Sequence, residues 1–333
     1  MSLKKIAEMT GLSTATVSHA LNGTRSVSEK SRLLVQEAAD KIGYKPSLAA
    51  QMLRTQRSGI VALIIPASSP TNDTNSFYFG VLNGARAALE EEGYDMIVTT
   101  YPERAEHVPL EKLRVLANRM VEGVLLVPYS REKGSADSLL DLDVPTVLLD
   151  RRVVDCPLPV VASDNHSAAV QVVELLAASG RRNIAFMGGK TSNSTVRERQ
   201  KGYREALARL GIPHSRSLEL TGLPDRVEEG CNGTALLLER GADAIFAENS
   251  MLMVGVEKYC RENGVKIPEQ LSLAGFDNAP WMEITDPPIT AVQQSADEMG
   301  MQGAKLLVGL IRGESGLPNE IVIPTQLVKR ESH

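Results

Sequence analysis

The chain is poor in cysteine, lacks long apolar runs and has no leader-like N-terminus, and each absence narrows its class. Its three cysteines lie far apart and form no CxxC pair, so reduced thiols in a reducing compartment are the simplest interpretation. No apolar run reaches the roughly 20 residues that a membrane helix needs. The N-terminal MSLKKIAEMTG has no apolar core and no small-residue cleavage site, which argues against a signal peptide. Together these absences predict a cytoplasmic protein with no membrane partner.

The sequence also lacks the common catalytic and cofactor motifs. It contains no G-x-S-x-G nucleophile elbow, no G-x-x-x-x-G-K-[ST] phosphate loop and no H-E-x-x-H zinc motif. Gly188-Gly189 follows an apolar run but has no third glycine to complete a dinucleotide-binding turn. The five histidines stand at no metal-ligand spacing from a cysteine or an acidic residue. We therefore expect no enzymatic activity, no cofactor and no bound metal.

Charge is distributed unevenly along the chain. The net charge is −5, yet residues 1–57 hold nine Lys and Arg against four acidic residues. A head of net charge +5 is therefore joined to a body of net charge −10. Such a head is suited to a polyanion such as DNA, although solvated charge clustered by chance would give the same count. The length of 333 residues, 43% of them apolar, favours more than one domain.

The first 45 residues have the pattern of three short helices. Gly11 is placed to end the first helix at a tight turn, and Ser13 is a suitable N-cap for a second helix that Asn22-Gly23 ends. Ser28 is suited to cap a third helix, which Gly43 ends. The residues expected to face inward from this third helix are Leu34, Val35, Ala38 and Ile42. Two helices joined by a tight turn can place the second one in a major groove.

The segments LKKIAEMTGLSTATVSHALNG and VSEKSRLLVQEAADKIGYKPSLAAQMLR resemble the head and hinge of the lactose-repressor (LacI/GalR) family of bacterial transcription regulators. The patterns T-x-T-V-S-x-x-L-N and G-Y-x-P-x-x-x-A-x-x-L carry this resemblance. The positions that it implies face base edges are Thr14, Ala15 and His19. Those that it implies contact the DNA backbone or support the helix are Thr16, Ser18 and Asn22. For Thr16 and Ser18, ordinary helix surface is the alternative.

Residues 46–57 form the expected hinge. Pro46 suits a helix start, and the resemblance implies that this helix enters the minor groove of an operator. Leu53 matches the residue that wedges between base pairs, and Arg54 beside it is suited to contact phosphates. Such a wedge unstacks a base step at a cost of a few kcal/mol, so an easily deformed operator centre is favoured. A core helix is the alternative for these apolar residues.

From Gly59 onward, short β-branched runs alternate with longer helical stretches. This alternation predicts an α/β protein with parallel sheets that helices cover on both faces. Two such series predict two lobes, with a ligand site beyond the carboxyl ends of the strands. The expected strands are 59–65, 94–100, 123–127 and 145–149 in the first series, and 183–189, 217–222, 242–247 and 271–277 in the second.

The body also resembles the two-lobed type I periplasmic-binding-protein core of the same family. The segments GGKTSNSTVRERQKGYREAL and LAGFDN, followed by ITAVQQ, carry this resemblance. It implies three crossings between the lobes, near residues 160–163, 291–293 and 319–321. Residues 1–45 are then the DNA-binding domain and residues 58–330 the effector-binding and dimerisation core. Within that core, the N-lobe is expected at about 58–160 plus 293–318, and the C-lobe at about 161–290 plus 321–330.

The resemblance implies an effector site in the cleft between these lobes. Arg199 matches the cleft arginine and Asp277 the cleft carboxylate, a pair suited to a hydroxyl-rich or acidic ligand. The full set of implied effector residues is Phe77, Tyr78, Arg151, Thr195, Arg199, Asn249 and Asp277. Where the family usually has Asn-Asp, this chain has Asn249-Ser250, so a carboxylate is missing there. Asp150 is matched to the far wall of the cleft, and Gln294 and Trp281 are weaker candidates near its mouth.

Several of these residues have structural alternatives. The alternative for Arg199 is a surface ion-pair former on an amphipathic helix, and the alternative for Asp277 is the cap of a turn. Phe77 and Tyr78 would serve as core residues. The alternatives predict different degrees of burial for these side chains, and only a structure tests them.

Three classes of function compete for this chain. A solute-binding protein for transport fits the body alone, but the basic head and the absence of a signal peptide argue against it, and no catalytic set supports an enzyme. We predict a transcriptional repressor that binds pseudo-palindromic double-stranded operator DNA as a homodimer. A small molecule, expected to be a sugar or a sugar derivative, controls it allosterically, and the direction of this control is left open. No apolar heptads follow the last expected strand, which favours a dimer over a coiled-coil tetramer.

Overall fold

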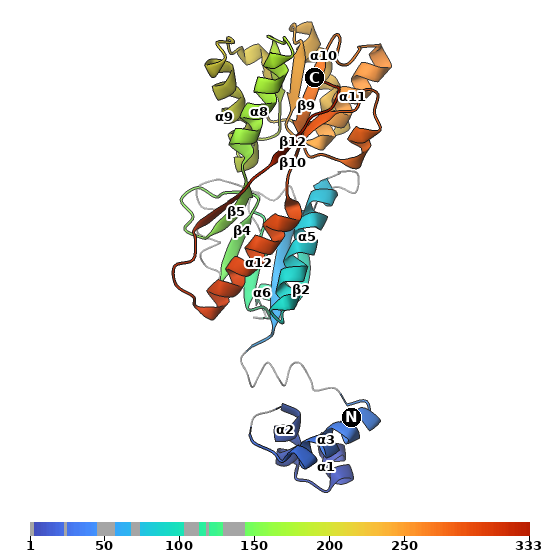
Figure 1. Ribbon diagram of the computed structural model, residues 1–333, viewed down its shortest axis with the longest axis vertical. Helices are drawn as coiled ribbons and strands as arrows, with labels where there is room; N and C mark the ends of the chain where they lie inside the picture. Colours follow the sequence, from blue (N-terminus) through green and yellow to red (C-terminus); the bar gives the residue numbers. More distant parts are fainter. Residues whose placement is uncertain are drawn as a thin grey trace. The chain divides into compact units, whose positions relative to one another are not determined.

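The computed structural model describes residues 3–22, 25–44, 57–67, 74–102, 113–117, 120–128 and 144–333. It contains two compact units, Met1–Ser58 and Gly59–His333 (Figure 1). The first unit is helical and the second contains two sheets flanked by helices, which confirms the α/β class predicted from the sequence. No helix in the described ranges is long and apolar enough to cross a membrane. The hinge residues Pro46, Leu53 and Arg54 lie outside these ranges.

The described residues of the first unit form three helices: α1 (Leu3–Thr10), α2 (Thr14–Asn22) and α3 (Glu29–Lys41). Gly11 has a φ of 66°, a left-handed conformation that lets the chain turn sharply between α1 and α2. Ser13 Oγ accepts the backbone N–H of Thr16 at 3.0 Å, and Ser28 Oγ accepts that of Ser31 at 3.2 Å. Both predicted helix starts are therefore confirmed. The shared core contains Ile6, Ala7, Val17, Val35, Ala38 and Ala39.

The inward face of α3 differs from the prediction at one position. Leu34 is 43% exposed, whereas Val35, Ala38 and Ala39 are buried and Ile42 packs against them. The buried stripe thus runs through Val35 and Ala39, which are one helical turn apart, and Leu34 lies on its flank. The prediction that Leu34 faces inward is wrong.

The first lobe of the second unit contains a parallel six-stranded sheet of order β11-β5-β4-β3-β1-β2. Its strands are β1 (Ile60–Ala67), β2 (Asp95–Pro102), β3 (Gly123–Leu126), β4 (Thr146–Leu149), β5 (Val160–Ser163) and β11 (Glu320–Ile323). Leu63 and Leu125 face a core formed with α5 (Thr74–Glu91) and α12 (Ala296–Arg312). Their neighbours Ile64 and Leu126 face the other side, where Leu116 of α6 (Arg114–Ala117) packs. Alternate residues of each strand therefore serve opposite faces.

The second lobe contains a six-stranded sheet of order β12-β10-β9-β8-β6-β7, in which only β12 runs antiparallel. Its strands are β6 (Ile184–Met187), β7 (Glu219–Leu220), β8 (Ala244–Ala247), β9 (Ser272–Phe276), β10 (Thr290–Gln293) and β12 (Gln326–Val328). One face packs on α8 (Asn165–Ala178) and α9 (Ser194–Arg209), the other on α10 (Val227–Glu239) and α11 (Ser250–Asn263). Two short 3₁₀ helices are η2 (Arg216–Leu218) and η3 (Pro280–Glu283).

The first five strands of each lobe follow one spatial order, 2-1-3-4-5 when they are counted within that lobe. In this order the chain reverses its direction of winding between the first and third strands. Ligands of open α/β sheets bind at this point, beyond the carboxyl ends of the strands. The fold therefore places a candidate site after β1 and β3 in the first lobe, and after β6 and β8 in the second.

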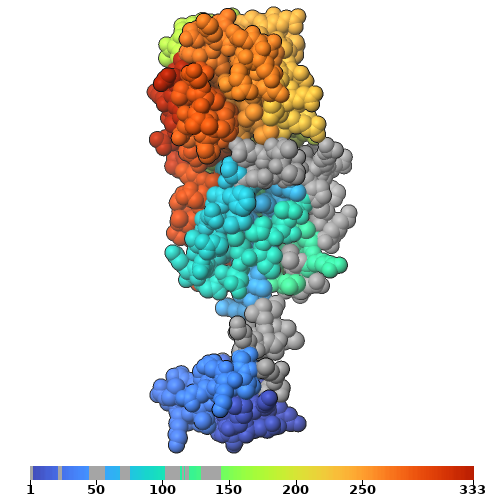
Figure 2. All heavy atoms as spheres, turned by 90° about the vertical axis from the view of Figure 1, so that its right-hand side faces the viewer, coloured from blue at the N-terminus to red at the C-terminus, as the bar shows by residue number. Residues whose placement is uncertain are grey.

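Three segments of chain connect the two lobes. In Figure 2 the first lobe is mostly cyan to teal and the second mostly yellow to orange. The chain leaves the first sheet after β5, returns between β10 and α12, and leaves again between β11 and β12 (Figure 1). Because Ile321 and Val322 pair with β5, the expected crossing at residues 319–321 is corrected to 324–325. Residues 161–163 likewise belong to the first sheet. The resemblance locates each crossing approximately, and the strand pairing in the structure gives the residues at which the chain leaves a sheet.

Candidate functional site

The helix α2 of the first unit carries most of the residues predicted to contact DNA. Those that are exposed, fully or in part, are Thr14, Ala15, Thr16, Ser18 and His19. Val17 is fully buried and fixes the rotation of the helix, so that the others face outward. The hydroxyl of Thr16 is hydrogen-bonded to that of Ser13 at 2.8 Å. The side chain of Asn22 lies outside the described part of the chain.

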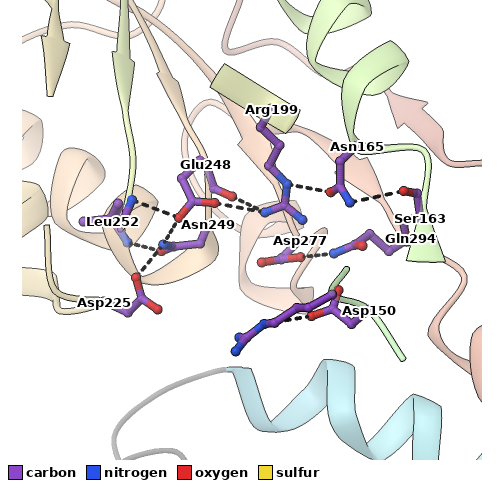
Figure 3. Close-up of polar contacts among 12 residues, drawn as sticks. Asp150, Ser163, Asn165, Arg199, Asp225, Glu248, Asn249, Leu252, Asp277 and Gln294 are labelled. Carbon is purple, nitrogen blue, oxygen red and sulfur yellow. Dashed lines mark hydrogen bonds and ion pairs between the residues drawn. The ribbon is translucent and has the colours of Figure 1, made fainter. Parts of the chain in front are cut away.

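In the second unit, polar side chains from both lobes gather at the carboxyl ends of the strands (Figure 3). Asp150 follows β4 of the first lobe, and Glu248 and Asp277 follow β8 and β9 of the second. Burial is the main cause that raises the pKa of Asp277, and the nearby carboxylates of Glu248 in its own lobe and Asp150 in the first lobe raise it further. We call this set the interlobe cluster; its members are Asp150, Arg151, Ser163, Asn165, Arg199, Glu248, Asp277 and Gln294.

Arg199 lies at the centre of the interlobe cluster, and its side chain is 5% exposed. Its Nε donates to Asn165 Oδ1 at 2.8 Å, and its Nη1 donates to the Glu248 carbonyl oxygen at 2.6 Å. The same Nη1 lies 3.1 Å from Glu248 Oε2, and the guanidinium stands 3.7 Å above the ring of Phe276. This burial rules out the alternative of a surface ion-pair former, since Arg199 is a rigidly held internal donor.

Asp277 presents a carboxylate from the second lobe. Its Oδ1 accepts a hydrogen bond from Gln294 Nε2 at 2.7 Å, and it forms no ion pair within the described residues. Burial raises the pKa of Asp277, and the nearby Arg199 and the bond from Gln294 offset this only in part. The turn at Asp277 is closed by its backbone carbonyl, which accepts from Ala279 N–H at 2.8 Å. The side chain is therefore directed into the interlobe cluster instead of capping the turn.

The first lobe contributes Asp150 and Arg151 to the interlobe cluster. Arg151 Nε lies 3.3 Å from Asp150 Oδ2, while its two Nη atoms donate to the Pro128 carbonyl and the Tyr78 hydroxyl at 3.3 and 3.2 Å. Tyr78 is 4% exposed and packs in the lobe core, with the ring of Phe77 5.5 Å away in an edge-on geometry. These two rings therefore belong to the core, and stacking on an effector remains a prediction. Burial raises the pKa of Asp150 although Arg151 lies beside it.

Asp150 and Asp277 occupy equivalent places in the two lobes. Each directly follows the fourth strand of its lobe, and their φ angles are 65° and 66°. A left-handed conformation costs a non-glycine residue roughly 1–2 kcal/mol, although aspartate tolerates it better than most residues. The same strained turn, used twice, directs one carboxylate from each lobe into the interlobe cluster (Figure 3).

Asn249 lies beside the interlobe cluster, and Thr195 lies one helical turn before Arg199 on α9. Asn249 caps α11, since its Oδ1 accepts the backbone N–H of Leu252 at 2.9 Å. Its Nδ2 donates to Asp225 Oδ1 at 2.9 Å and to Glu248 Oε1 at 3.0 Å. Thr195 is buried in the first turn of α9. Because the amide of Asn249 is already bonded on both sides, it orients Glu248, and ligand contact by Asn249 or Thr195 remains a prediction.

Glu248 and Asn165 are cluster members that the sequence reasoning missed. Glu248 is 3% exposed and follows β8, and its Oε1 accepts the backbone N–H of Gly189 at 3.1 Å. Glu248 places a carboxylate two residues before Ser250, the position at which the resemblance implies an aspartate. The rule that a ligand site lies at strand carboxyl ends would have selected Glu248, as it selects Asp277. Asn165 opens α8, and no sequence signal distinguishes it.

A second contact joins the lobes beside the interlobe cluster. Arg152 Nη1 lies 2.9 Å from Glu198 Oε2 on α9, and Arg152 also pairs with Glu320 of its own lobe. The backbone N–H of Arg152 donates to Ser194 Oγ at 2.8 Å. Both ion-pair side chains are about a quarter exposed, so the pair is screened by solvent. In the described residues, no group of three or more His, Cys, Asp or Glu is arranged to hold a metal ion.

A three-helix head and a two-lobed α/β core with a polar cluster between its lobes define a class: helix-turn-helix regulators with a periplasmic-binding-protein-like sensor. Comparison with known families agrees with this class. Residues 2–47 match the family described as bacterial regulatory proteins, lacI family. Residues 173–333 match the periplasmic binding protein-like domain.

Known relatives extend the match over the whole chain. The HTH-type transcriptional regulator CelR of Thermobifida fusca is 32% identical over 99% of this chain and 97% of its own. DegA of Bacillus subtilis (strain 168), another HTH-type transcriptional regulator, is 29% identical over 98% of this chain and 96% of its own. A solved CelR–cellobiose complex is 30% identical, covers 100% of both chains and has a TM-score of 0.74. The chain belongs to the LacI family of bacterial transcriptional regulators.

Proposed function

We propose that this regulator binds a specific operator and that a small hydroxylated molecule held in the interlobe cluster changes its operator affinity. The observation that carries this proposal is the place of Arg199, a buried arginine of the second lobe that lies among polar side chains of both lobes (Figure 3). A ligand held among these groups contacts both lobes, so its binding free energy depends on the angle between them. Membership of a family of transcriptional regulators supports the role of the head.

On the DNA side, we infer that α2 lies in the major groove. Thr14 and His19 are suited to hydrogen-bond base edges, whereas Ala15 offers only a methyl contact, for example to thymine. Thr16, Ser18 and Asn22 are suited to phosphate contacts that fix the register. The exposure of Thr14 and Ala15 supports this assignment.

We further infer a homodimer in which residues 1–45 bind half-sites about one helical turn apart and residues 46–57 form the hinge. Leu53 is proposed to wedge into the minor groove at the operator centre, with Arg54 on a phosphate. An effector that changes the lobe angle in residues 58–330 would change the spacing of the two hinges. Coupling of this kind changes affinity by about 5- to 150-fold.

Cellobiose is the first effector to test, because the solved complex of a relative 30% identical to this chain contains it. Binding sites are selected from random duplex DNA with the purified full chain, and operator Kd is measured by fluorescence anisotropy at fixed salt, with and without cellobiose, glucose and galactose. We expect a sequence preference and a Kd that at least one sugar changes by about fivefold or more. A lack of sequence preference would overturn the DNA assignment. A sugar that binds the protein but leaves the operator Kd unchanged would overturn the allosteric one.

The hinge assignment has its own test in the Leu53→Ala variant. Loss of the wedge should weaken operator binding by about tenfold, which corresponds to about 1.4 kcal/mol, and leave non-specific DNA binding unchanged. The comparison is made at one salt concentration with the selected operator and a scrambled duplex. Equal losses on both duplexes would exclude the wedge.

A further inference from the structure

Both guanidinium groups of the interlobe cluster already have an anionic partner in the chain. Arg199 Nη1 lies 3.1 Å from Glu248 Oε2, and Arg151 Nε lies 3.3 Å from Asp150 Oδ2. All four side chains are at most 14% exposed. An acidic ligand would therefore displace a buried carboxylate and leave it without its counter-charge, which is strongly unfavourable in such surroundings.

The remaining hydrogen-bonding capacity of the interlobe cluster consists mostly of acceptors. Gln294 Nε2 donates a hydrogen bond to Asp277, so Gln294 Oε1 points away from Asp277. This buried oxygen has no hydrogen-bond partner among the described residues. The buried Ser163 Oγ likewise has none within the described ranges. Asp277 adds a second carboxylate oxygen. On the donor side, Nη2 of Arg199 and the buried Nε of Arg151 lack a hydrogen bond to a described residue.

The interlobe cluster also carries excess negative charge. Three carboxylates (Asp150, Glu248 and Asp277) stand against the two guanidinium groups of Arg151 and Arg199. Burial raises the pKa of both Asp150 and Asp277, and Glu248 adds to the rise of each. Another negative charge among these groups would increase the repulsion, whereas donors and positive charge would relieve it.

We propose that Glu248 sets the charge class of the effector, so that the interlobe cluster takes a neutral or positively charged polyhydroxylated molecule and rejects its carboxylate and phosphate counterparts. A hydroxyl group both donates and accepts, so it fits the oxygens of Asp277 and Gln294 on one side and Nη2 of Arg199 on the other. Glu248 acts through Arg199. By neutralising it, Glu248 withdraws the more deeply buried of the two cations that an acid would otherwise use. This inference rests on the proposed function in taking the interlobe cluster as the effector site.

The test compares sugars that differ only in charge. Melting temperature and calorimetric Kd of the full chain, without DNA, are measured with glucose, galactose, cellobiose and glucosamine, and with glucuronate, galacturonate, cellobionate and glucose 6-phosphate. We expect at least one neutral or amino sugar to bind about tenfold or more tightly than its acidic counterpart. An acid that binds as tightly as its neutral form would overturn the proposal. A panel in which no neutral or amino sugar binds would overturn it as well.

The Glu248→Gln variant tests the residue itself, because it keeps the shape of the side chain and removes its charge. We expect the preference for the neutral sugar over its acid to fall about tenfold. Asp277→Asn removes one negative charge from the interlobe cluster but leaves Arg199 paired with Glu248. It should therefore lower the preference less than Glu248→Gln does, and an equal fall in both variants would show that only the total charge matters. Glu92→Gln is the matched control, since Glu92 pairs with Arg312 on the first lobe away from the interlobe cluster and should leave the preference unchanged. An unchanged preference in Glu248→Gln would overturn the assignment, whatever the result for Asp277→Asn.

The two proposals fail in distinguishable ways. If neutral sugars bind with the expected preference but operator Kd does not respond, the charge-class inference stands and the allosteric function fails. If operator Kd responds to an acid that binds in preference to neutral sugars, the function stands and the charge-class inference fails.

Discussion

The two lobes share one strand order, yet the aspartate that follows the fourth strand has different bonding partners in each lobe. In the first lobe, Asp150 pairs with its neighbour Arg151, which Tyr78 and the Pro128 carbonyl also hold. In the second lobe, the hydrogen bond that Asp277 Oδ1 accepts from the described residues comes from the neutral amide of Gln294. The arginine of the second lobe is instead committed to Glu248. The first lobe thus presents a neutralised pair and the second an excess of acceptors, so the second lobe should dominate ligand selection.

The largest difference is expected when each lobe loses its arginine. Arg199→Met leaves Glu248 buried without a counter-charge and should lower the free energy of unfolding by about 3–5 kcal/mol. Arg151→Met should cost about 1–2 kcal/mol, because its ion pair is more exposed and part of its bonding is to neutral oxygens. Urea unfolding of both variants, followed by circular dichroism at neutral pH, measures the two losses. Equal losses would contradict the contrast between the lobes.

A smaller, pH-dependent difference is expected at the two aspartates. Burial raises the native pKa of Asp277 above its unfolded value, so its contribution to stability is fully present below about pH 4 and is lost as pH rises through the native pKa. Asp277→Asn cannot ionise and escapes this loss. Its melting temperature relative to the parent should therefore rise between pH 4 and pH 7.5.

Asp150→Asn serves as the matched comparison for this pH effect. It removes an equally placed carboxylate but leaves Arg151 without its partner, so most of the gain at neutral pH should be cancelled. Thermal scans of the three proteins across this pH range decide the matter. If the difference between Asp277→Asn and the parent does not change with pH, Asp277 does not titrate in that window.

The sequence predicted the architecture well and the interlobe cluster less completely, for a physical reason. Strands and caps depend on local pattern, so the runs around β1, β6 and β9 and the caps Ser13 and Ser28 could be located from it. Leu34 was misplaced because adjacent residues on a helix differ by only about 100°, and the partner helices decide which flank is covered.

Contacts between segments distant in the chain could not be predicted in this way. Asn165 binds Arg199 across 34 positions, and Glu248 binds it across 49. The position of Glu248 after a strand was readable, but its pairing with Arg199 depends on the orientation of α9 over the sheet. The third crossing was misplaced by a few residues because β11 gains its place only by pairing with β5, far away in sequence.

The smallest expected effect concerns the ion pair that links the lobes. Glu198→Gln breaks the contact with Arg152 and should change stability by less than about 1 kcal/mol, because both side chains are partly exposed. If a bound sugar requires the lobes as they are held here, sugar affinity should still fall about threefold, since the pair favours that arrangement. Glu92→Gln breaks a comparable exposed pair with Arg312 inside the first lobe and should leave sugar affinity unchanged. Calorimetric titration of both variants with the sugar selected above separates the outcomes. Equal sugar affinities of the two variants would mean that the Arg152–Glu198 ion pair does not influence the closure of the lobes. The difference between the lobes in ligand binding would then depend on the interlobe cluster alone.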